Sequence, residues 1–279
     1  MKLHQLDANN YSVKSWEDKF PDFNVDLNTL PINDSYKEFY ESEIFKTNID
    51  LVNKYLSYCL NFSNGKVKIY PYPDLVFNAL NATPLDKIKI VILGQDPYHD
   101  FINHNEVEVP QAMGLSFSVP KNITVPSSLK NIYKNLKKFG HINKIPEHGN
   151  LSFWAHQGVL LINTILTVQK GCPNGHIKKW TKLTDALIEF ISKNTNNVVF
   201  MLWGGNAYEK YKLIDSKKHK IIVSSHPSGL SCSTKFRQFN CFNDEDHFTK
   251  ANEYLKQHNK TEILFEIIQG FIYNILIIL

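Results

Sequence analysis

Two short segments of the chain place an ionisable side chain among turn-forming residues, and both could take part in acid–base chemistry. Asp96 stands in the segment 94–99 (GQDPYH), and His226 stands in 226–231 (HPSGLS). A carboxylate can orient water or stabilise a cation, and an imidazole can donate a hydrogen bond to a developing anion. Asp-Pro and His-Pro are also common in turns without catalytic function, so residue type alone leaves a structural interpretation open for both.

Other polar or glycine positions also follow apolar runs. Asn163 comes directly after the run 159–162 (VLLI), and Gly204 and Gly205 follow 198–203 (VVFMLW). An amide in an apolar run must find hydrogen-bond partners, either in the backbone of the core or in a bound ligand. Both interpretations of Asn163 remain open from its position alone.

The elements that must position these residues are predicted by periodicity. Short apolar runs rich in β-branched residues predict buried strands at 88–93, 159–162, 198–203 and 220–223. Helical spacing of apolar residues occurs at 35–62, 128–139, 181–194, 206–214 and 244–258. Alternating strands and helices predict an α/β fold: a single three-layer domain with a central, mostly parallel four-stranded sheet flanked by helices.

This topology predicts where a site would form. In open parallel sheets, ligands bind outside the carboxyl ends of the strands. Each of the four predicted strands is followed by a polar or glycine-rich segment that begins near Gly94, Asn163, Gly204 or Ser224. We therefore expect Asp96 and His226 to meet at one edge of the sheet, although they are far apart in the chain.

Composition limits the function classes without choosing among them. The 279 residues are 43% hydrophobic and 21% charged, which is typical of a globular protein and not of a disordered one. The net charge of +4 is compatible with a nucleic-acid partner but does not require one. The four cysteines are scattered without the spacing of a zinc site, and the N-terminus lacks the apolar stretch of a secretory signal. We predict an intracellular protein of the nucleus or cytoplasm, from a viral or cellular source.

Three parts of the chain differ in character. Residues 1–34 form an irregular N-terminal segment, 35–258 form the domain with the strand and helix pattern, and 259–279 form an apolar C-terminal extension. The run 263–279 is almost entirely apolar but short for a membrane span, and polar residues interrupt it. We favour an element docked on the core, or an extension, over a membrane anchor.

Four segments in order resemble the characteristic blocks of the family-1 uracil-DNA glycosylases. They are 94–99 (GQDPYH), 160–168 (LLINTILTV), 202–205 (LWGG) and 226–231 (HPSGLS). With weaker similarity between these blocks, the resemblance covers about residues 15–257. It implies an enzyme of base excision repair that hydrolyses the N-glycosidic bond between uracil and deoxyribose in DNA and leaves an abasic site. Uracil anion is a tolerable leaving group, so no metal and no cofactor is expected.

The resemblance also assigns roles around the reacting bond. Asp96 would orient the attacking water and stabilise the cationic sugar, and His226 would donate a hydrogen bond to uracil O2. The pocket residues would be Gln95 through its backbone, Asn163 pairing with uracil, Tyr98 where thymine carries its methyl group, and Phe117 stacked on the base. Without the resemblance, Tyr98 would be interpreted as a surface residue on a turn and Phe117 as a core residue.

The remaining loops would contact DNA from which a nucleotide has been flipped. Leu230 resembles the apolar wedge that fills the space left by the flipped base, although an exposed leucine is usually unremarkable in function. Phosphate contacts are expected from His99, Ser128, Gly204, Gly205 and Ser228. Ser128 also suits the N-cap of the helix predicted at 128–139, and both roles could coexist.

The chain departs from the family pattern at several positions. Gly229 replaces a proline in the wedge loop, Gly205 replaces a common serine, and Met113 stands where histidine is frequent. The segment 100–110 is longer than usual, and its glutamates are not expected to approach DNA. We expect these differences to weaken DNA affinity and flipping of the nucleotide more than cleavage of the glycosidic bond.

We therefore predict a monomeric glycosylase that acts on single- and double-stranded DNA containing uracil, with a replication or repair protein as a further partner. A DNA-binding or replication scaffold that uses the same fold is the alternative, and altered base preference is a third. Retention of Asp96, Tyr98, Asn163 and His226 favours the active, uracil-specific enzyme, because a scaffold would not need that set.

Overall fold

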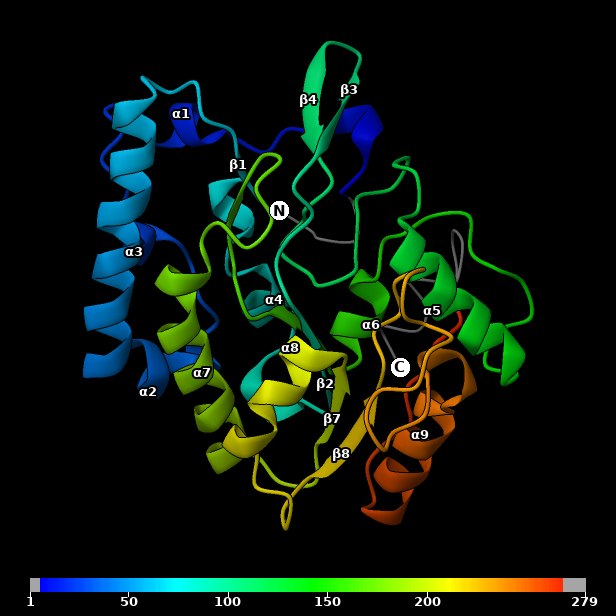
Figure 1. Ribbon diagram of the computed structural model, residues 1–279. Helices are drawn as coiled ribbons and strands as arrows, with labels where there is room; N and C mark the ends of the chain where they lie inside the picture. The colour runs from blue at the N-terminus through cyan, green and yellow to red at the C-terminus, as the bar shows by residue number, and fades with distance from the viewer. Residues whose placement is uncertain (1–5, 268–279) are drawn as a thin grey trace.

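The computed structural model describes residues 6–267, and its centre is a four-stranded parallel sheet with the order β5-β2-β7-β8. The helices and strands are α1 Trp16–Lys19, α2 Lys37–Tyr40, α3 Glu43–Phe62, β1 Ile69–Tyr70, α4 Asn78–Ala82, β2 Ile90–Gly94, β3 Phe101–His104, β4 Val107–Pro110, α5 Ser127–Lys138, α6 Ser152–His156, β5 Val159–Asn163, β6 Val168–Gln169, α7 Ile177–Asn194, β7 Val199–Trp203, α8 Gly205–Tyr208, β8 Lys220–Ser224 and α9 His247–Gln257. Helices α3 and α7 lie on one side of the sheet and α5, α6 and α9 on the other (Figure 1). The predicted three-layer α/β fold is confirmed.

Parallel pairing aligns the carboxyl ends of the strands. The register pairs Gly94 of β2 with Asn163 of β5, and Trp203 of β7 with Ser224 of β8. The strands end near the middle of Figure 1, below the β3–β4 hairpin that follows β2. All four predicted strands are confirmed, with ends shifted by at most two residues.

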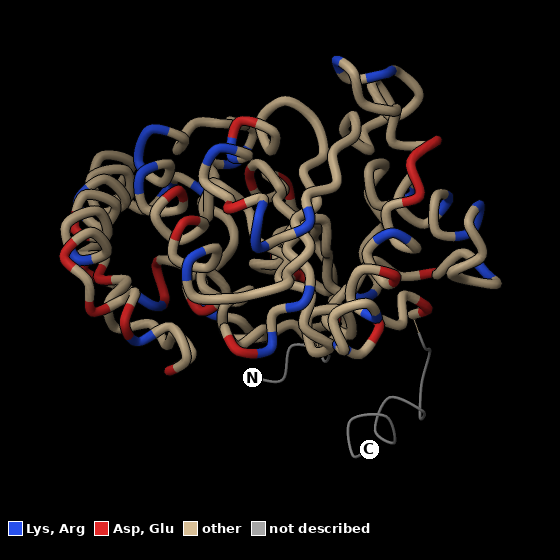
Figure 2. Tube along the Cα trace, turned by 90° about the horizontal axis from the view of Figure 1, so that it is seen from below, with Lys and Arg blue, Asp and Glu red and all other residues tan. Residues whose placement is uncertain are grey.

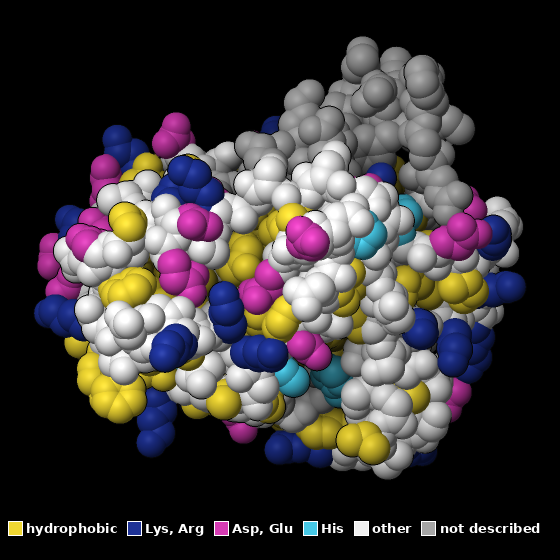
Figure 3. Space-filling model, turned by 90° about the horizontal axis from the view of Figure 1, so that it is seen from above, with side chains coloured by type: hydrophobic (Ala, Val, Ile, Leu, Met, Phe, Trp, Pro, Cys, Tyr) yellow, Lys and Arg dark blue, Asp and Glu magenta, His cyan; other side chains and the backbone are white. Residues whose placement is uncertain are grey.

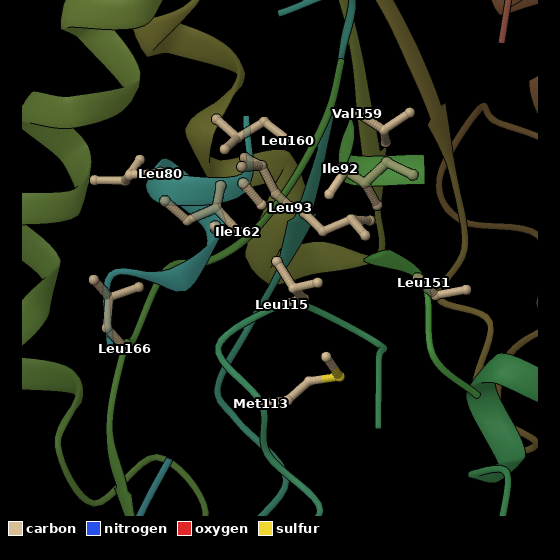
Figure 4. Packing of buried hydrophobic residues seen from close by; sticks show 14 of the residues in the cluster. Leu80, Ile92, Leu93, Met113, Leu115, Leu151, Val159, Leu160, Ile162 and Leu166 are labelled. Carbon is tan, nitrogen blue, oxygen red and sulfur yellow. The ribbon is translucent and has the colours of Figure 1, made fainter. Parts of the chain in front are cut away.

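The central strands are apolar on both faces because helices cover both sides of the sheet. Every residue of β2 and β7 is buried, which explains a continuous apolar run instead of an alternating one. Figure 4 shows Ile92 and Leu93 of β2 beside Leu160 and Ile162 of β5, with Leu115 packed against them. This packing fixes the strand ends that carry the polar segments.

The helices differ from the predicted ranges where capping residues end or begin them. The range 35–62 is divided, because Ser42 Oγ accepts a hydrogen bond from the Phe45 N–H and starts α3. Likewise α9 begins at His247, because the Asp246 side chain accepts from the Thr249 N–H. The range 206–214 is a single α-helical turn, α8, followed by a 3₁₀ helix, and α7 begins four residues before the predicted start.

Both terminal segments contribute to the core. Trp16 and Leu27, in the segment predicted to be irregular, are fully buried. Ile263, Phe265 and Ile267 are buried as well, and the Trp154 indole N–H donates to the Phe265 carbonyl at 3.1 Å. The described start of the apolar extension is therefore docked on the core, and residues 268–279 lie outside the described residues. No helix within 6–267 is long and apolar enough to cross a membrane.

The long segment 100–110 forms the β3–β4 hairpin, which projects at the top of Figure 1. Its residue Glu108 accepts hydrogen bonds from the hydroxyls of Tyr70 and Tyr72 at 3.0 and 2.9 Å. Glu108 thus anchors β4 to β1 and the segment after β1, while Glu106 lies exposed in the turn.

Charged residues contribute little to the stability of this fold. Seen from below, lysine and acidic residues are interspersed over the molecule (Figure 2). Most ion pairs are exposed, such as Lys54 with Asp50 at 3.1 Å, and such pairs contribute about 0–1 kcal/mol. Stability therefore rests mainly on the apolar core.

Truncation of a core side chain should show this dependence. Leu202 in β7 is 0% exposed, so Leu202→Ala should lower the free energy of unfolding by about 2–5 kcal/mol through lost burial and a residual cavity. Leu51→Ala in α3, where the leucine is 52% exposed, should change it by less than about 0.5 kcal/mol. Urea unfolding measures both, and equal losses in the two variants would contradict the account.

Candidate active site

A cavity of about 230 Å³ opens at the carboxyl ends of β2 and β5. The predicted site residues in its lining are Gln95, Asp96, Tyr98, His99, Phe117, Ser128, Asn163 and His226. Figure 3 looks onto this end of the molecule, where histidine side chains reach the surface beside a recess in the lower half of the picture. The fold therefore brings together both acid–base candidates and all four predicted pocket residues.

A second hollow of about 340 Å³ adjoins the first and shares Gly94, Gln95 and His226 with it. Gly204, Gly205 and Ser228, three of the residues predicted to contact phosphate, line this hollow. Leu230 lines neither hollow. It lies beyond them on the loop after β8, with 98% of its surface exposed.

Asp96 lies in the loop after β2 and is half-buried. Its Oδ2 accepts a hydrogen bond of 2.8 Å from the backbone N–H of Asn174. Burial raises the pKa of Asp96 above its ordinary value, while the Asn174 N–H and nearby His99 oppose that rise. The hydrogen bond fixes one carboxylate oxygen, so the group can face a reacting atom in a single orientation.

Asn174 is a residue that the sequence did not predict in the site. Its backbone is in the left-handed region with a φ of 65°, and its side-chain oxygen accepts a hydrogen bond from Gln95 Nε2. The neighbouring Pro173 lines the cavity. Asn-Gly at 174–175 is typical of a turn, but nothing in the local sequence indicates that this turn folds over Asp96.

His226 has its ring orientation fixed by the loop that carries it. Its Nδ1 accepts a hydrogen bond of 3.0 Å from the Ser228 N–H, so the proton of the neutral ring is on Nε2. Burial lowers the pKa of His226 and favours that neutral form. Gly204 allows this arrangement, because a Cβ there would lie 2.9 Å from the Cβ of His226.

Asn163, at the end of β5, directs its carboxamide into the space beside Gly94. A Cβ on Gly94 would lie 2.0 Å from Asn163 Oδ1, so only glycine leaves room for this amide. Among residues 6–267 the carboxamide has no hydrogen-bond partner. The interpretation of Asn163 as a core amide bonded to backbone is therefore wrong for the described chain, and the group is available to a ligand.

Phe117 and Tyr98 contribute two aromatic rings to the lining of the cavity. The Tyr98 hydroxyl donates to the Phe117 carbonyl at 3.2 Å, and Phe117 has a left-handed φ of 63°, which is unusual for a large side chain. The Phe117 ring centroid lies 5.5 Å from that of Trp203 and 5.9 Å from that of His226. Trp203, which lines the second hollow and packs against Phe117, is another residue that the sequence did not single out.

The predicted N-cap role of Ser128 is wrong. Helix α5 begins at Ser127 with Pro126 at the N-cap position, and no side chain caps it. Because Pro126 already holds the extended backbone needed there, Ser128 falls in the first helical turn. It is half-buried at the wall of the cavity.

Comparison with known proteins gives a consistent result. The model of the uracil DNA glycosylase superfamily matches residues 81–256. The uracil-DNA glycosylase of Helicobacter hepaticus is 43% identical over 87% of this chain and 98% of its own length. A probable uracil-DNA glycosylase of Acanthamoeba polyphaga mimivirus is 40% identical over 94% of this chain and 72% of its own length. The crystal structure of mimivirus uracil-DNA glycosylase aligns with a TM-score of 0.86 and 39% identity, covering 95% of this chain and 98% of that one.

The protonation state of His226 can be measured directly. Because burial lowers its pKa and Nδ1 is an acceptor, we expect a neutral ring with the proton on Nε2 at pH 7. Imidazole ¹⁵N chemical shifts, assigned by comparison with His226→Gln, report this form. A doubly protonated ring at pH 7, or a proton on Nδ1, would contradict the geometry.

Proposed function

This chain belongs to the uracil-DNA glycosylase superfamily and removes uracil from DNA, and on that premise we propose that it is a family-1 enzyme with Asp96 and His226 as its catalytic pair. One observation carries the proposal. A single cavity at the carboxyl edge of the sheet is lined by a half-buried carboxylate, a neutral imidazole and a carboxamide that has no hydrogen-bond partner among residues 6–267. When a glycosidic bond breaks, the carboxylate can stabilise the positive charge on the sugar, and the imidazole can donate a hydrogen bond to the negative charge on the base.

Cleavage of the N-glycosidic bond separates charge into a cationic sugar and a uracil anion. Asp96 stabilises the cation and orients the water whose oxygen bonds to the sugar carbon. The bonding electrons stay with uracil, and the proton that the water releases is balanced by the one that the uracil anion takes up from solvent. The hydrogen bond from the Asn174 N–H keeps the carboxylate from rotating away from that position. The products are free uracil and an abasic site.

His226 acts on the other side of the bond. Its Nε2–H donates to uracil O2, and this hydrogen bond strengthens as negative charge collects on the departing base. A neutral imidazole suits the role because the Ser228 N–H fixes the tautomer before substrate arrives. No reorganisation of the ring is then needed during the reaction.

Selection of uracil follows from three side chains. The carboxamide of Asn163 pairs with uracil O4 and N3–H, whereas cytosine would leave unmatched donors in the cavity. Tyr98 occupies the place where thymine carries its methyl group, and its bond to the Phe117 carbonyl keeps it there. Phe117 stacks on the base.

The surface around the cavity supports DNA binding. Leu230 is almost fully exposed on the loop that begins at His226, which suits an apolar wedge that fills the space of the flipped nucleotide. Phosphate contacts are assigned to His99, Ser128, Gly204, Gly205 and Ser228. The proposed enzyme acts as a monomer on single- and double-stranded DNA.

Removal of the Asp96 charge should abolish most turnover. Asp96→Asn should slow uracil release roughly 10²- to 10⁴-fold with a change of only a few-fold in binding, because the carboxylate acts mainly on the transition state. The measurement is alkaline cleavage of a fluorescent oligonucleotide with one uracil, with EDTA present. A matched oligonucleotide with thymine should remain uncut. A variant that turns over at the wild-type rate would exclude Asp96 as the catalytic carboxylate.

Leu230 should matter only where a base must leave a helix. Leu230→Ala should reduce kcat/KM about tenfold on duplex DNA and less than about twofold on single-stranded DNA, since the latter needs no wedge. The same oligonucleotide with and without its complement provides the comparison. Equal losses on both substrates would show that Leu230 is not a wedge.

A further inference from the structure

His247 is a fully buried histidine that has no part in the mechanism above. It is the first residue of α9, and its ring stacks on Phe242 with centroids 4.7 Å apart. Its Nδ1 lies 3.2 Å from the Trp203 indole nitrogen, and its Nε2 lies 3.5 Å from Ser224 Oγ. Both partners are the last residues of strands, β7 and β8, that lead into the active site.

The directions of these hydrogen bonds are determined by chemistry. An indole N–H only donates, so Nδ1 of His247 accepts and the ring proton is on Nε2. Nε2–H therefore faces Ser224 Oγ, whose own hydrogen points to the Ser225 carbonyl at 2.8 Å. Burial lowers the pKa of His247 to about 3, so the ring stays neutral and keeps this direction near neutral pH.

This series of bonds reaches both sides of the cavity. On one side, the Trp203 ring contacts the Phe117 ring with a centroid distance of 5.5 Å. On the other side, Ser225 directly precedes His226 and its hydroxyl donates to the Ser231 carbonyl at 2.8 Å. The Ser231 hydroxyl donates in turn to the His226 carbonyl at 3.0 Å.

We propose that His247 is a positioning residue: it joins the ends of β7 and β8 so that Phe117 and His226 Nε2 meet the same base. The inference rests on the proposed role of His226. Hydrogen bonds act over a short range of distance and angle, so a displacement of about 1 Å of the donor can reduce the rate up to about 10²-fold.

The chain offers a matched control for an ordinary buried histidine. His219 is also buried in the core, and its ring contacts Phe200 at a centroid distance of 5.2 Å. Its nitrogens bond the Val198 N–H and the Ser192 carbonyl at 3.2 and 2.8 Å. It precedes β8, however, and so lies at the amino end of the strand, away from the cavity.

The test compares His247→Phe with His219→Phe in the full chain. Each variant keeps a ring in the core but loses two hydrogen bonds. We expect His247→Phe to lower kcat on single-stranded uracil DNA about tenfold or more with KM changed less than about twofold. His219→Phe should keep kcat within about twofold at a comparable loss of Tm. His247→Gln, which retains a donor and an acceptor, should recover part of kcat.

Equal kcat values in His247→Phe and His219→Phe would overturn the inference. If His247→Phe does not fold, Ser224→Ala removes the second bond together with the bond from the Ser224 hydroxyl to the Ser225 carbonyl, and leaves the Trp203–His247 bond in place. An unchanged kcat in Ser224→Ala would overturn the inference as well. His226→Ala in the same assay distinguishes a failure of the proposed role of His226 from a failure of the inference on His247. Wild-type turnover in that variant would refute the role of His226, whereas a loss there beside unchanged His247 variants would refute the inference on His247 alone.

Discussion

The parallel hydrogen-bond register of the central sheet is the constraint on which the rest of the structure depends. Because β2 pairs with β5 and β7, and β7 pairs with β8, the four strands end at one edge. Gly94 then lies opposite Asn163, and the missing side chains at Gly94 and Gly204 leave space for the amide and the imidazole. A shift of the register would separate these groups and remove the cavity.

Burial shifts the pKa values of the two proposed catalytic groups in opposite directions. It raises the pKa of Asp96 and lowers the pKa of His226, so in each case it disfavours the charged form. Only Asp96 has groups that oppose this effect, the Asn174 N–H and His99. The site thus holds a carboxylate supported by hydrogen bonding and a neutral imidazole donor, which is the asymmetry that the proposed mechanism requires.

Much of this arrangement could be predicted from the sequence, since the apolar runs marked the strands and the polar residues directly followed them. The β3–β4 hairpin was not predicted, because its pairing depends on a turn at Asn105 and Glu106 with positive φ angles that most side chains disfavour. Asn174 and His247 were missed for another reason. Each contacts the site through folding of distant segments, and no local pattern records that contact.

The central claim is that these distant side chains enclose one uracil base. A crystal structure of the protein with free uracil tests it most directly. The account predicts uracil stacked on Phe117, with O2 at His226 Nε2 and with O4 and N3–H at the Asn163 carboxamide. Uracil bound outside this cavity, or in it with the His226 ring turned away from O2, would contradict the account.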